Sequence, residues 1–488
     1  MDLDVRYVNR PPTIARFQDS NAFVRGIRGP FGSAKSTACC IEILRRSAEQ
    51  PIGPGGKRRS RWAVVRNTYP ELKTTTIKTW HTIVPQTVGR WVEQGPPTHW
   101  LEFEDCSIEV LFLALDSPSD VAKLLSMDLT GAWINEAREV IKPVLDGLTG
   151  RVGRFPPATE GGWSGIIMDT NSPDTDHWWY VLAEKDRSTG RNAEMLDSIE
   201  AAEEELRRLA VLGVDQPLFE FFAQPSGLDA EAENVQNLPA GYYQRMSAGK
   251  SKAWINVYVQ GNYGFVQDGR AVHPEYLDDH HCRTFELVKG WPLVVGIDFG
   301  LTPAAAIVQR SPMGHWRCRY ELTTTHMGAK RFGKLLRDFL DTKCAGFEIV
   351  AITGDPSGST ESQSDESTPY QLLKASGIVA HPANTNDPLI RREALDGPLM
   401  RFEDGQPGFL VHPDCNFIRK GLAGRYAYKR VQGVDERYHD SPDKNAYSHP
   451  CEALHYALMG GGEVRKVLGR KPRSGLLKFA EMNYNELG

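Results

Sequence analysis

Residues 29–36, with the sequence GPFGSAKS, constrain the fold of this chain more than any other segment. They match the pattern G-x-x-x-x-G-K-[ST] at every fixed position but one, and loops of this pattern surround phosphates with backbone N–H groups. The apolar run 22–27 precedes the loop, and a helix-forming stretch, 36–48, follows it. A strand, a glycine turn and a helix N-terminus in this order are typical of an anion-binding site.

This loop predicts a site for ATP and Mg²⁺. Lys35 would reach the β- and γ-phosphates, and the Ser36 hydroxyl would bind Mg²⁺. Ala34 stands where the pattern has its last glycine. We expect residue 34 to have a near-helical φ, where alanine costs little, and Gly32 to make the sharper turn. The predicted nucleotide-binding residues are Gly29, Gly32, Ser33, Ala34, Lys35, Ser36 and Thr37.

An ATPase also needs an acid at the end of a second strand, to hold the hydrated Mg²⁺ and activate water. Residues 129–139, LTGAWINEARE, place Asn135 and Glu136 after a short apolar run. Asn135 stands where Asp is usual; it can accept a hydrogen bond from metal-bound water but brings no charge. Glu136 is therefore the candidate general base.

Three more polar residues fit a nucleotide site. Arg151 and Arg154 follow in a glycine-rich segment. An arginine finger from such a loop would neutralise transition-state charge, in its own subunit or in a neighbouring one. Asn171 follows the apolar strand 165–169 and would contact the γ-phosphate or position water.

Two acids end apolar strands in the second half of the chain, Asp298 after LVVGI and Asp355 after EIVAITG. If these strands are neighbours, the carboxylates converge, and such oxygen ligands suit Mg²⁺ or Mn²⁺. Two such ions support phosphodiester hydrolysis. Segment 440–455 would supply the remaining ligand. Asp443 and Glu452 rank equally, His449 is a supporting or alternative ligand, and Asp440 ranks last.

A rival interpretation concerns residues 298–302, DFGLT, which resemble the phosphate-binding hairpin of actin and the sugar kinases. That class shares the ribonuclease H topology but uses the hairpin to bind ATP. Because the chain already has a nucleotide site in its first half, we prefer the carboxylate interpretation.

The order of elements predicts an α/β protein with two main domains. We expect a P-loop ATPase domain with a mostly parallel sheet at 1–215, a linker or lid at 216–288, a ribonuclease H-like nuclease domain at 289–462 and a basic, flexible tail at 463–488. The 57 basic and 62 acidic residues give a net charge of −5, which excludes a histone-like polycation. The eight cysteines form no C-x-x-C pair, which argues against a zinc ribbon or a disulfide scaffold.

The chain resembles the large terminase subunit of tailed bacteriophages over residues 15–462. The segments that carry the resemblance are GPFGSAKS, VVRNTY (64–69), WINEA (133–137), DTNSPDTDHWW (169–179), VQGNYG (259–264), GIDFG (296–300), TGDPSGS (353–359) and KNAYSHPCEALHYA (444–457). Ala34 and Asn135 depart from the family pattern. The resemblance implies an ATP-driven motor that pumps double-stranded DNA through the portal of an empty capsid and cuts it. It also implies a portal protein, a small terminase subunit and a ring, usually of five subunits.

Two alternatives differ in class. A helicase-like or repair ATPase fused to a nuclease is disfavoured because no second set of helicase motifs is present. A structural protein with decayed sites is disfavoured because Lys35, Ser36, Glu136, Asp298 and Asp355 are intact. With no secretory signal or membrane span predicted, we expect the chain in the host cytoplasm and transiently at the portal vertex, but not in the mature virion.

Overall fold

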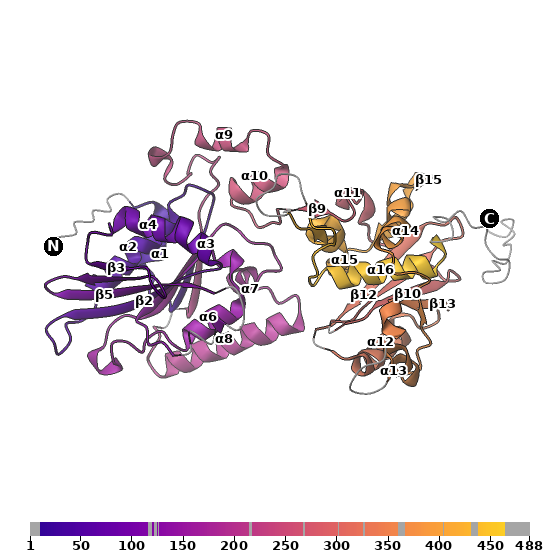
Figure 1. The fold of residues 1–488 in the computed structure, drawn as a ribbon, viewed down its shortest axis with the longest axis horizontal. Helices are drawn as coiled ribbons and strands as arrows, with labels where there is room; N and C mark the ends of the chain where they lie inside the picture. Colours follow the sequence, from indigo (N-terminus) through magenta and orange to yellow (C-terminus); the bar gives the residue numbers. More distant parts are fainter. Residues whose placement is uncertain are drawn as a thin grey trace. The chain divides into compact units, whose positions relative to one another are not determined.

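The computed structural model describes residues 10–115, 120–121, 124, 126–213, 217–266, 269–300, 302–325, 327–359, 367–403, 405–430 and 438–463. The chain divides into two compact units, Met1–Val266 and Gln267–Gly488 (Figure 1). This division falls inside the region 216–288 that we expected as a linker, because its first part packs on the phosphate loop of the first unit. The predicted basic tail, apart from its first residue, lies outside the described residues.

The first unit is built on an eight-stranded sheet with the order β3-β4-β5-β2-β6-β7-β1-β8. Six strands are parallel: β1 (Val24–Arg28), β2 (Arg58–Arg66), β5 (Cys106–Ala114), β6 (Gly131–Asn135), β7 (Gly165–Thr170) and β8 (Phe219–Ala223). The antiparallel strands β3 (Arg90–Val92) and β4 (Thr98–Glu102) extend one edge. The predicted mostly parallel sheet is therefore confirmed.

Helices cover both faces of this sheet, so the central strands β6 and β7 are buried at every position. Along β2, Trp62 and Val64 join the core beneath α1 (Pro12–Asp19), α2 (Lys35–Ala48) and α4 (Ile77–Ile83). The intervening Ala63 and Val65 join the opposite core, with α6 (Lys142–Thr149), α7 (Trp178–Glu184) and α8 (Gly190–Arg208). The longest of these helices, α8, ends at Arg208, and the Thr189 side chain caps its N-terminus.

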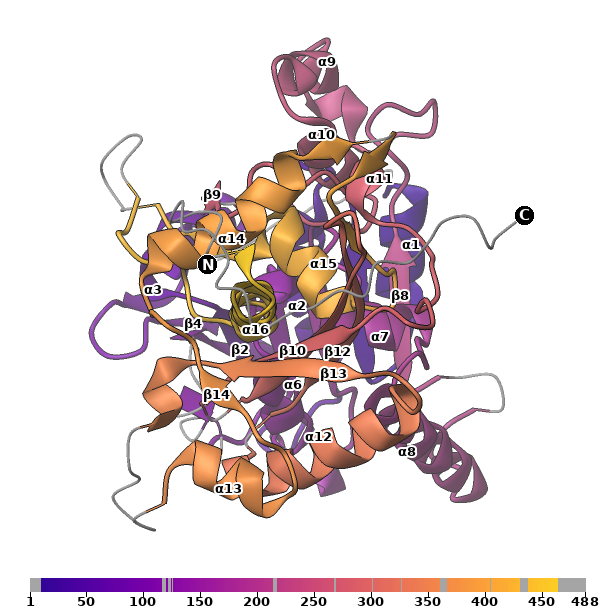
Figure 2. The ribbon, with the colours of Figure 1, turned by 90° about the vertical axis from the view of Figure 1, so that its right-hand side faces the viewer.

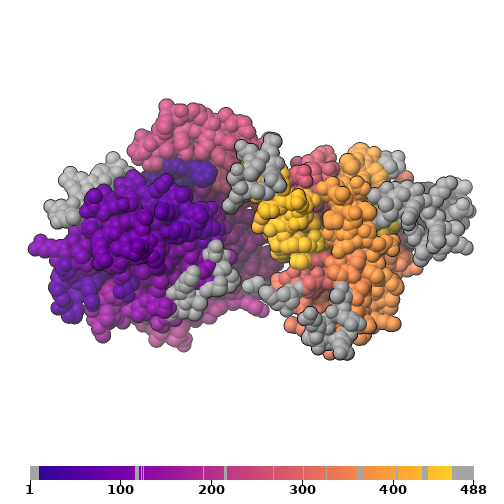
Figure 3. Space-filling model, in the orientation of Figure 1, coloured from indigo at the N-terminus to yellow at the C-terminus, as the bar shows by residue number. Residues whose placement is uncertain are grey.

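The last part of the first unit carries the short helices α9 (Tyr242–Ser247) and α10 (Lys252–Tyr258). In the space-filling view this segment forms one side of the unit (Figure 3).

The second unit contains a six-stranded sheet with the order β14-β13-β10-β11-β12-β17. The strands β10 (Leu293–Asp298), β11 (Ala304–Arg310) and β12 (Trp316–Thr323) form an antiparallel meander. On the other side of β10, β13 (Ile349–Gly354) and β14 (His381–Pro382) run parallel to it, while β17 (Phe409–Val411) pairs with β12. This meander followed by parallel strands agrees with the predicted ribonuclease H-like topology.

Two helical layers cover this second sheet (Figure 2). On one face lies α16 (Ser448–Gly460), with α14 (Pro388–Met400) and α15 (Asn416–Lys420) in the same layer; on the other lie α12 (Ala329–Lys343) and α13 (Pro369–Ala375). The short helix α11 (Asp278–His281) precedes the sheet. At Gly296 a Cβ would lie 1.8 Å from the Ala453 carbonyl oxygen, so only glycine lets α16 pack so close to β10.

The remaining sequence expectations concern cysteines and membranes. All eight cysteines are unpaired, as expected without a disulfide scaffold. Among the described residues, no helix has both the length and the apolar character needed to cross a membrane.

Candidate functional site

The phosphate loop lies between β1 and α2, at the carboxyl edge of the parallel sheet, as its sequence predicts. Gly32 has a φ of 74° and makes the expected turn. Ala34, however, has φ 64° and ψ 20°, in the left-handed region. Our expectation of a near-helical φ at this position was therefore wrong. The loop keeps a backbone that suits glycine, and alanine at this position carries a strain of about 1–2 kcal/mol.

The Lys35 ammonium group faces into the loop. It donates hydrogen bonds to the carbonyl oxygens of Gly29, at 3.1 Å, and Pro30, at 2.7 Å, and to the Ser33 hydroxyl at 3.2 Å. Burial lowers the pKa of Lys35, although the nearby carboxylates of Glu136 and Asp169 oppose that shift. An ammonium group held by these three oxygens is placed to pair with a phosphate oxygen.

Asn135 and Asp169 meet beneath the start of α2. The Asn135 amide nitrogen donates to both Asp169 carboxylate oxygens, at 3.0 and 3.2 Å, while its oxygen accepts from the Thr76 hydroxyl at 2.6 Å. We expected the Asn135 oxygen to accept from metal-bound water, but it is already engaged by Thr76. Sequence reasoning did not select Asp169. The apolar run 165–168 ends at this acid, which marks the end of a strand but does not tell which residue it faces.

Glu136 follows β6 and has a left-handed φ of 51°. Its carboxylate accepts a hydrogen bond from the Asn171 backbone N–H at 3.3 Å. Burial, together with the Asp169 charge, raises the pKa of Glu136, while Lys35 and Arg66 oppose the shift. A carboxylate with a raised pKa near the phosphate loop has the chemistry of a general base.

Asn171 and Arg66 complete the surroundings of this carboxylate. The Asn171 side chain donates to the Gly29 carbonyl oxygen at 2.8 Å, which ties the end of β7 to the phosphate loop. Arg66, which we did not select from the sequence, ends β2 and forms an ion pair with Glu139 at 3.1 Å. Asn171, which we predicted, and Arg66, which we did not, thus both lie with Glu136 at the carboxyl edge of the sheet.

Arg151 and Arg154 lie at the opposite edge. The Leu129 backbone N–H donates to the Arg151 carbonyl oxygen at 3.1 Å, and the Arg154 N–H donates to the Leu129 carbonyl oxygen at 3.1 Å. Leu129 comes before β6, whereas Asn135 ends it. At about 3.3 Å per residue, six residues of strand separate the two ends by about 20 Å. This position favours action on a neighbouring subunit's nucleotide over action on the same subunit's, and a finger role for either arginine stays a prediction.

The segment between β8 and the end of the first unit contacts the phosphate loop from outside. The Gln224 side chain bonds to Ser33, the Asn234 amide donates to the Gly32 carbonyl oxygen at 2.7 Å, and the Tyr243 hydroxyl donates to the Phe31 carbonyl oxygen at 2.9 Å. The Phe31 ring stacks on Tyr258, with centroids 4.6 Å apart. These contacts fix the outer side of the loop.

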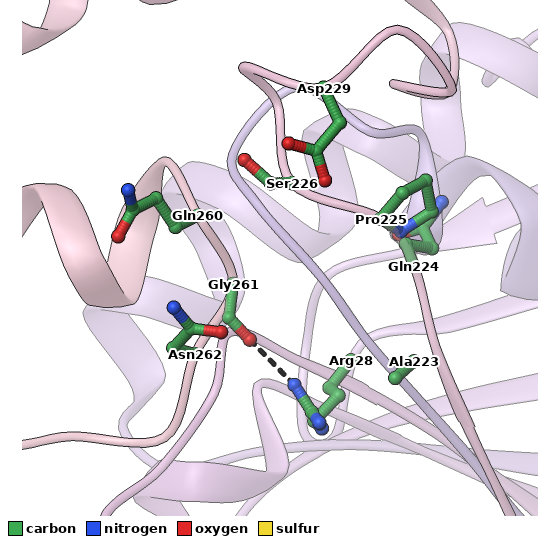
Figure 4. Close-up of a pocket in the computed structure, with 9 residues that line it drawn as sticks. All are labelled: Arg28, Ala223, Gln224, Pro225, Ser226, Asp229, Gln260, Gly261 and Asn262. Atoms are coloured by element: carbon green, nitrogen blue, oxygen red, sulfur yellow. Dashed lines mark hydrogen bonds between the residues drawn. The ribbon is translucent and has the colours of Figure 1, made fainter.

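A polar pocket of about 380 Å³ lies beside this contact. Figure 4 shows the side chains around it, with Arg28 donating to the Gly261 carbonyl oxygen at 2.6 Å. Its lining residues are Arg28, Ala223, Gln224, Pro225, Ser226, Asp229, Gln260, Gly261 and Asn262. Because Arg28 directly precedes the phosphate loop and Gln224 bonds to Ser33, the pocket adjoins that loop.

Asp298 and Asp355 are neighbours in the second unit. The strands β10 and β13 pair Ile297 with Gly354, and the Asp355 backbone N–H donates to the Ile297 carbonyl oxygen at 3.1 Å. The two carboxylates therefore end adjacent parallel strands, which meets the condition that the carboxylate interpretation set. Asp298 is buried, and its pKa is raised by that burial and by the charge of Glu452, against the effect of His449.

The three candidates for the remaining ligand have different partners. The His449 ring lies against the Asp298 carboxylate, with Nδ1 2.6 Å from Oδ2. Glu452 is buried and bonds to the Tyr426 hydroxyl and the Lys444 ammonium group. Asp443 pairs with Lys429 at 2.8 Å. In the part of the chain that the structure describes, no three His, Cys, Asp or Glu side chains are gathered so that they could hold a metal ion.

A buried imidazole pair lies beneath α16. His273 and His455 approach through their Nε2 atoms at 2.7 Å, and the His273 Nδ1 lies 2.6 Å from the Asp396 carboxylate. In this geometry the His273 Nδ1–H donates a hydrogen bond to Asp396, and the His273 Nε2 accepts one from the His455 Nε2–H. Burial holds the pKa of His455 well below its usual value, and His273, Arg391, Lys444 and Arg392 act in the same direction.

Comparisons with known proteins give matches among solved structures alone: no protein-family model and no curated protein matches this chain. The chain is similar to the large terminase of a thermophilic bacteriophage in complex with ADP, at 13% identity and a TM-score of 0.38, covering 94% of this chain and 100% of that one. It is similar to the HK97 bacteriophage large terminase at 9% identity and a TM-score of 0.40, covering 93% and 95%. The Thermus phage P74-26 large terminase ATPase domain matches at 12% identity and a TM-score of 0.31, covering 52% and 94%.

Proposed function

We propose that this chain is a large terminase subunit, an ATPase that drives double-stranded viral DNA through a portal into an empty capsid and cuts it. One observation carries the proposal: two chemically different sites occupy the carboxyl edges of two separate sheets in a single chain. The first combines a phosphate loop with Glu136, and the second places Asp298 beside Asp355. A motor that translocates and cuts DNA needs both chemistries.

In the first site, the loop N–H groups and Lys35 bind the phosphates of ATP, and Glu136 takes a proton from the attacking water. Ser36 offers its hydroxyl to Mg²⁺, whose charge would stabilise the negative phosphate oxygens when it is bound. Asn171 donates to the Gly29 carbonyl oxygen through its side chain and to Glu136 through its backbone N–H, so it fixes the loop and Glu136 relative to each other. Through Asn171, a movement of the phosphate loop would also move the end of β7.

In the second site, Asp298 and Asp355 offer adjacent oxygen ligands that suit Mg²⁺ or Mn²⁺. Such ions, when bound, would stabilise charge at the phosphodiester being cut. His449 already contacts Asp298, whereas Glu452 is neutralised by Lys444 and lies near Arg391. We therefore place His449 ahead of Glu452 as the completing ligand, with Asp443 as the loop alternative.

The partners follow from the same proposal. The substrate is double-stranded DNA, and the portal protein, a small terminase subunit and a ring, of five copies, on the capsid complete the machine. Arg151 and Arg154, which are remote from their own nucleotide site, would meet the site of the neighbouring copy in such a ring.

Two activities of the purified full chain test the proposal: DNA-stimulated ATP hydrolysis and Mn²⁺-dependent cutting of plasmid DNA. Lys35→Ala should abolish the first and keep the second, and Asp298→Asn should do the reverse. Each variant thus serves as the folding control for the other. Absence of both activities from the parent chain, or unwinding of a forked duplex by it, would contradict a packaging motor, the latter favouring a helicase-like ATPase.

A further inference from the structure

Asp169 is a buried negative charge whose hydrogen-bond donors are all neutral. Its carboxylate accepts hydrogen bonds from the Ser36 hydroxyl at 2.5 Å, from the Trp133 indole N–H at 2.7 Å and from the Asn135 amide. The side chain is fully buried. Within the described ranges, no Lys or Arg forms an ion pair with it, since Lys35 faces the loop carbonyls instead.

A buried carboxylate without an ion-pair partner is costly, so its setting indicates what it is for. A purely structural acid would be paired with a cation. Asp169 instead bonds directly to the hydroxyl of Ser36, at the first turn of the helix that follows the phosphate loop. A divalent cation that arrives there with a nucleotide would supply the missing positive charge.

The neighbouring Asn135 explains why the acid stands on β7 and not on β6. The register pairs Asn135 with Asp169 directly across the two strands. An aspartate at 135 would place a second carboxylate about 3 Å from the first, and two such charges repel strongly. An amide at 135 donates to Asp169 and orients it. β7 thus carries the carboxylate, and β6 carries the amide that donates a hydrogen bond to it.

We propose that Asp169 supplies the acidic group for the Mg²⁺ of the nucleotide, and that Asn135 is the positioning residue that holds it. This inference rests on the proposed ATPase function and assigns the carboxylate that the sequence pattern lacks at 135. It predicts that the pair can be exchanged. The variant with Asn135→Asp and Asp169→Asn has the same charge, volume and hydrogen-bonding groups on opposite strands.

The test uses the full chain carrying Asp298→Asn throughout, so that the proposed second metal site does not contribute. It measures Mn²⁺ bound in the presence of ADP, by electron paramagnetic resonance, together with ADP affinity without metal. Asp169→Asn should weaken Mn²⁺ binding by at least about tenfold, because it removes the negative charge and one of the two acceptor oxygens. Metal-free ADP binding should stay intact, because Lys35 and the loop N–H groups are unchanged. The double exchange should recover most of the loss. Asn135→Asp alone should lower the melting temperature, since it adds a facing charge. Asp396→Asn, a buried acid of the second unit, is the matched control and should change neither measurement.

The outcomes separate this inference from the proposed function. If the parent chain binds no ADP, the proposed function fails. If it binds Mn²⁺ and ADP but Asp169→Asn binds Mn²⁺ equally well, only the assignment of Asp169 is overturned. A double exchange that folds without recovering Mn²⁺ binding would overturn it too. Unfolding of every Asp169 variant, the exchange included, would mark the residue as structural and have the same consequence.

Discussion

Replacing Ala34 by glycine should leave the first unit as stable or slightly more stable, although glycine usually weakens the start of a helix. At φ 64° and ψ 20°, an L-residue has a strain of about 1–2 kcal/mol that glycine does not. Two effects oppose this gain. Glycine loses about 0.5–1 kcal/mol more backbone entropy on folding than alanine, and removing a half-buried methyl group costs about 0.4 kcal/mol. The net expectation is a gain of about 0.3 kcal/mol in the free energy of unfolding, by the same principles.

Two other alanines of the same unit provide controls for this substitution. Ala210 also has a left-handed φ, 57°, and is exposed, so Ala210→Gly should stabilise somewhat more. Ala201 is exposed within α8, where glycine should cost about 1 kcal/mol. Calorimetry of the full chain would compare the three variants in the transition of the first unit. If Ala34→Gly destabilised that unit as much as Ala201→Gly, the strain argument for the phosphate loop would be refuted.

Four further predictions follow, three on the two sites and one on the buried histidine pair. Glu136→Gln should bind ATP and fail to hydrolyse it, as filter binding and phosphate release would show; lost binding would indicate a structural role. Mixing Arg151→Ala with Glu136→Gln should restore some ATPase activity in assembled rings, and no rescue at any ratio would argue against action between subunits. His449→Ala should abolish plasmid cutting at saturating Mn²⁺ and spare ATP hydrolysis, whereas parental cutting would remove His449 from the metal site. His455 stays neutral in the fold and gains a proton on unfolding, so the free energy of unfolding of the second unit should fall by up to about 1.4 kcal/mol per pH unit below about pH 6.5. Denaturant titrations should show a smaller fall in His455→Gln. An equal fall would contradict this assignment.

Much of the fold could be predicted because apolar runs and turn residues report burial directly. The strand runs of both sheets could be identified in this way, and the convergence of Asp298 and Asp355 could be predicted only on the condition that their strands are neighbours. The phosphate loop was identifiable because its chemistry requires a fixed spacing over eight residues.

The features that sequence reasoning missed have in common that the surrounding fold decides them, and the local residues do not. Asp169 gains its significance from lying across from Asn135 on the next strand, and a linear reading cannot supply that register. The placement of Arg151 depended on which edge of the sheet its loop joins, since loops at the two edges have similar composition. The conformation of Ala34 was missed because we inferred it from the residue type, whereas the surrounding loop sets it.

Backbone strain in the first unit gathers at the nucleotide site. Of the five described non-glycine residues with a positive φ, Ala34 lies in the phosphate loop, Glu136 follows the opposing strand and Asn234 bonds to the Gly32 carbonyl oxygen. Each such residue costs about 1–3 kcal/mol and persists only where its neighbours fix the backbone. Those neighbours here are buried strands and the helix α2, so the strain is sustained by packing formed before any ligand binds. A loop held in this way needs no rearrangement to bind the phosphates of the proposed ATP, so substitutions that relax the strain should affect ATP turnover more than they affect folding.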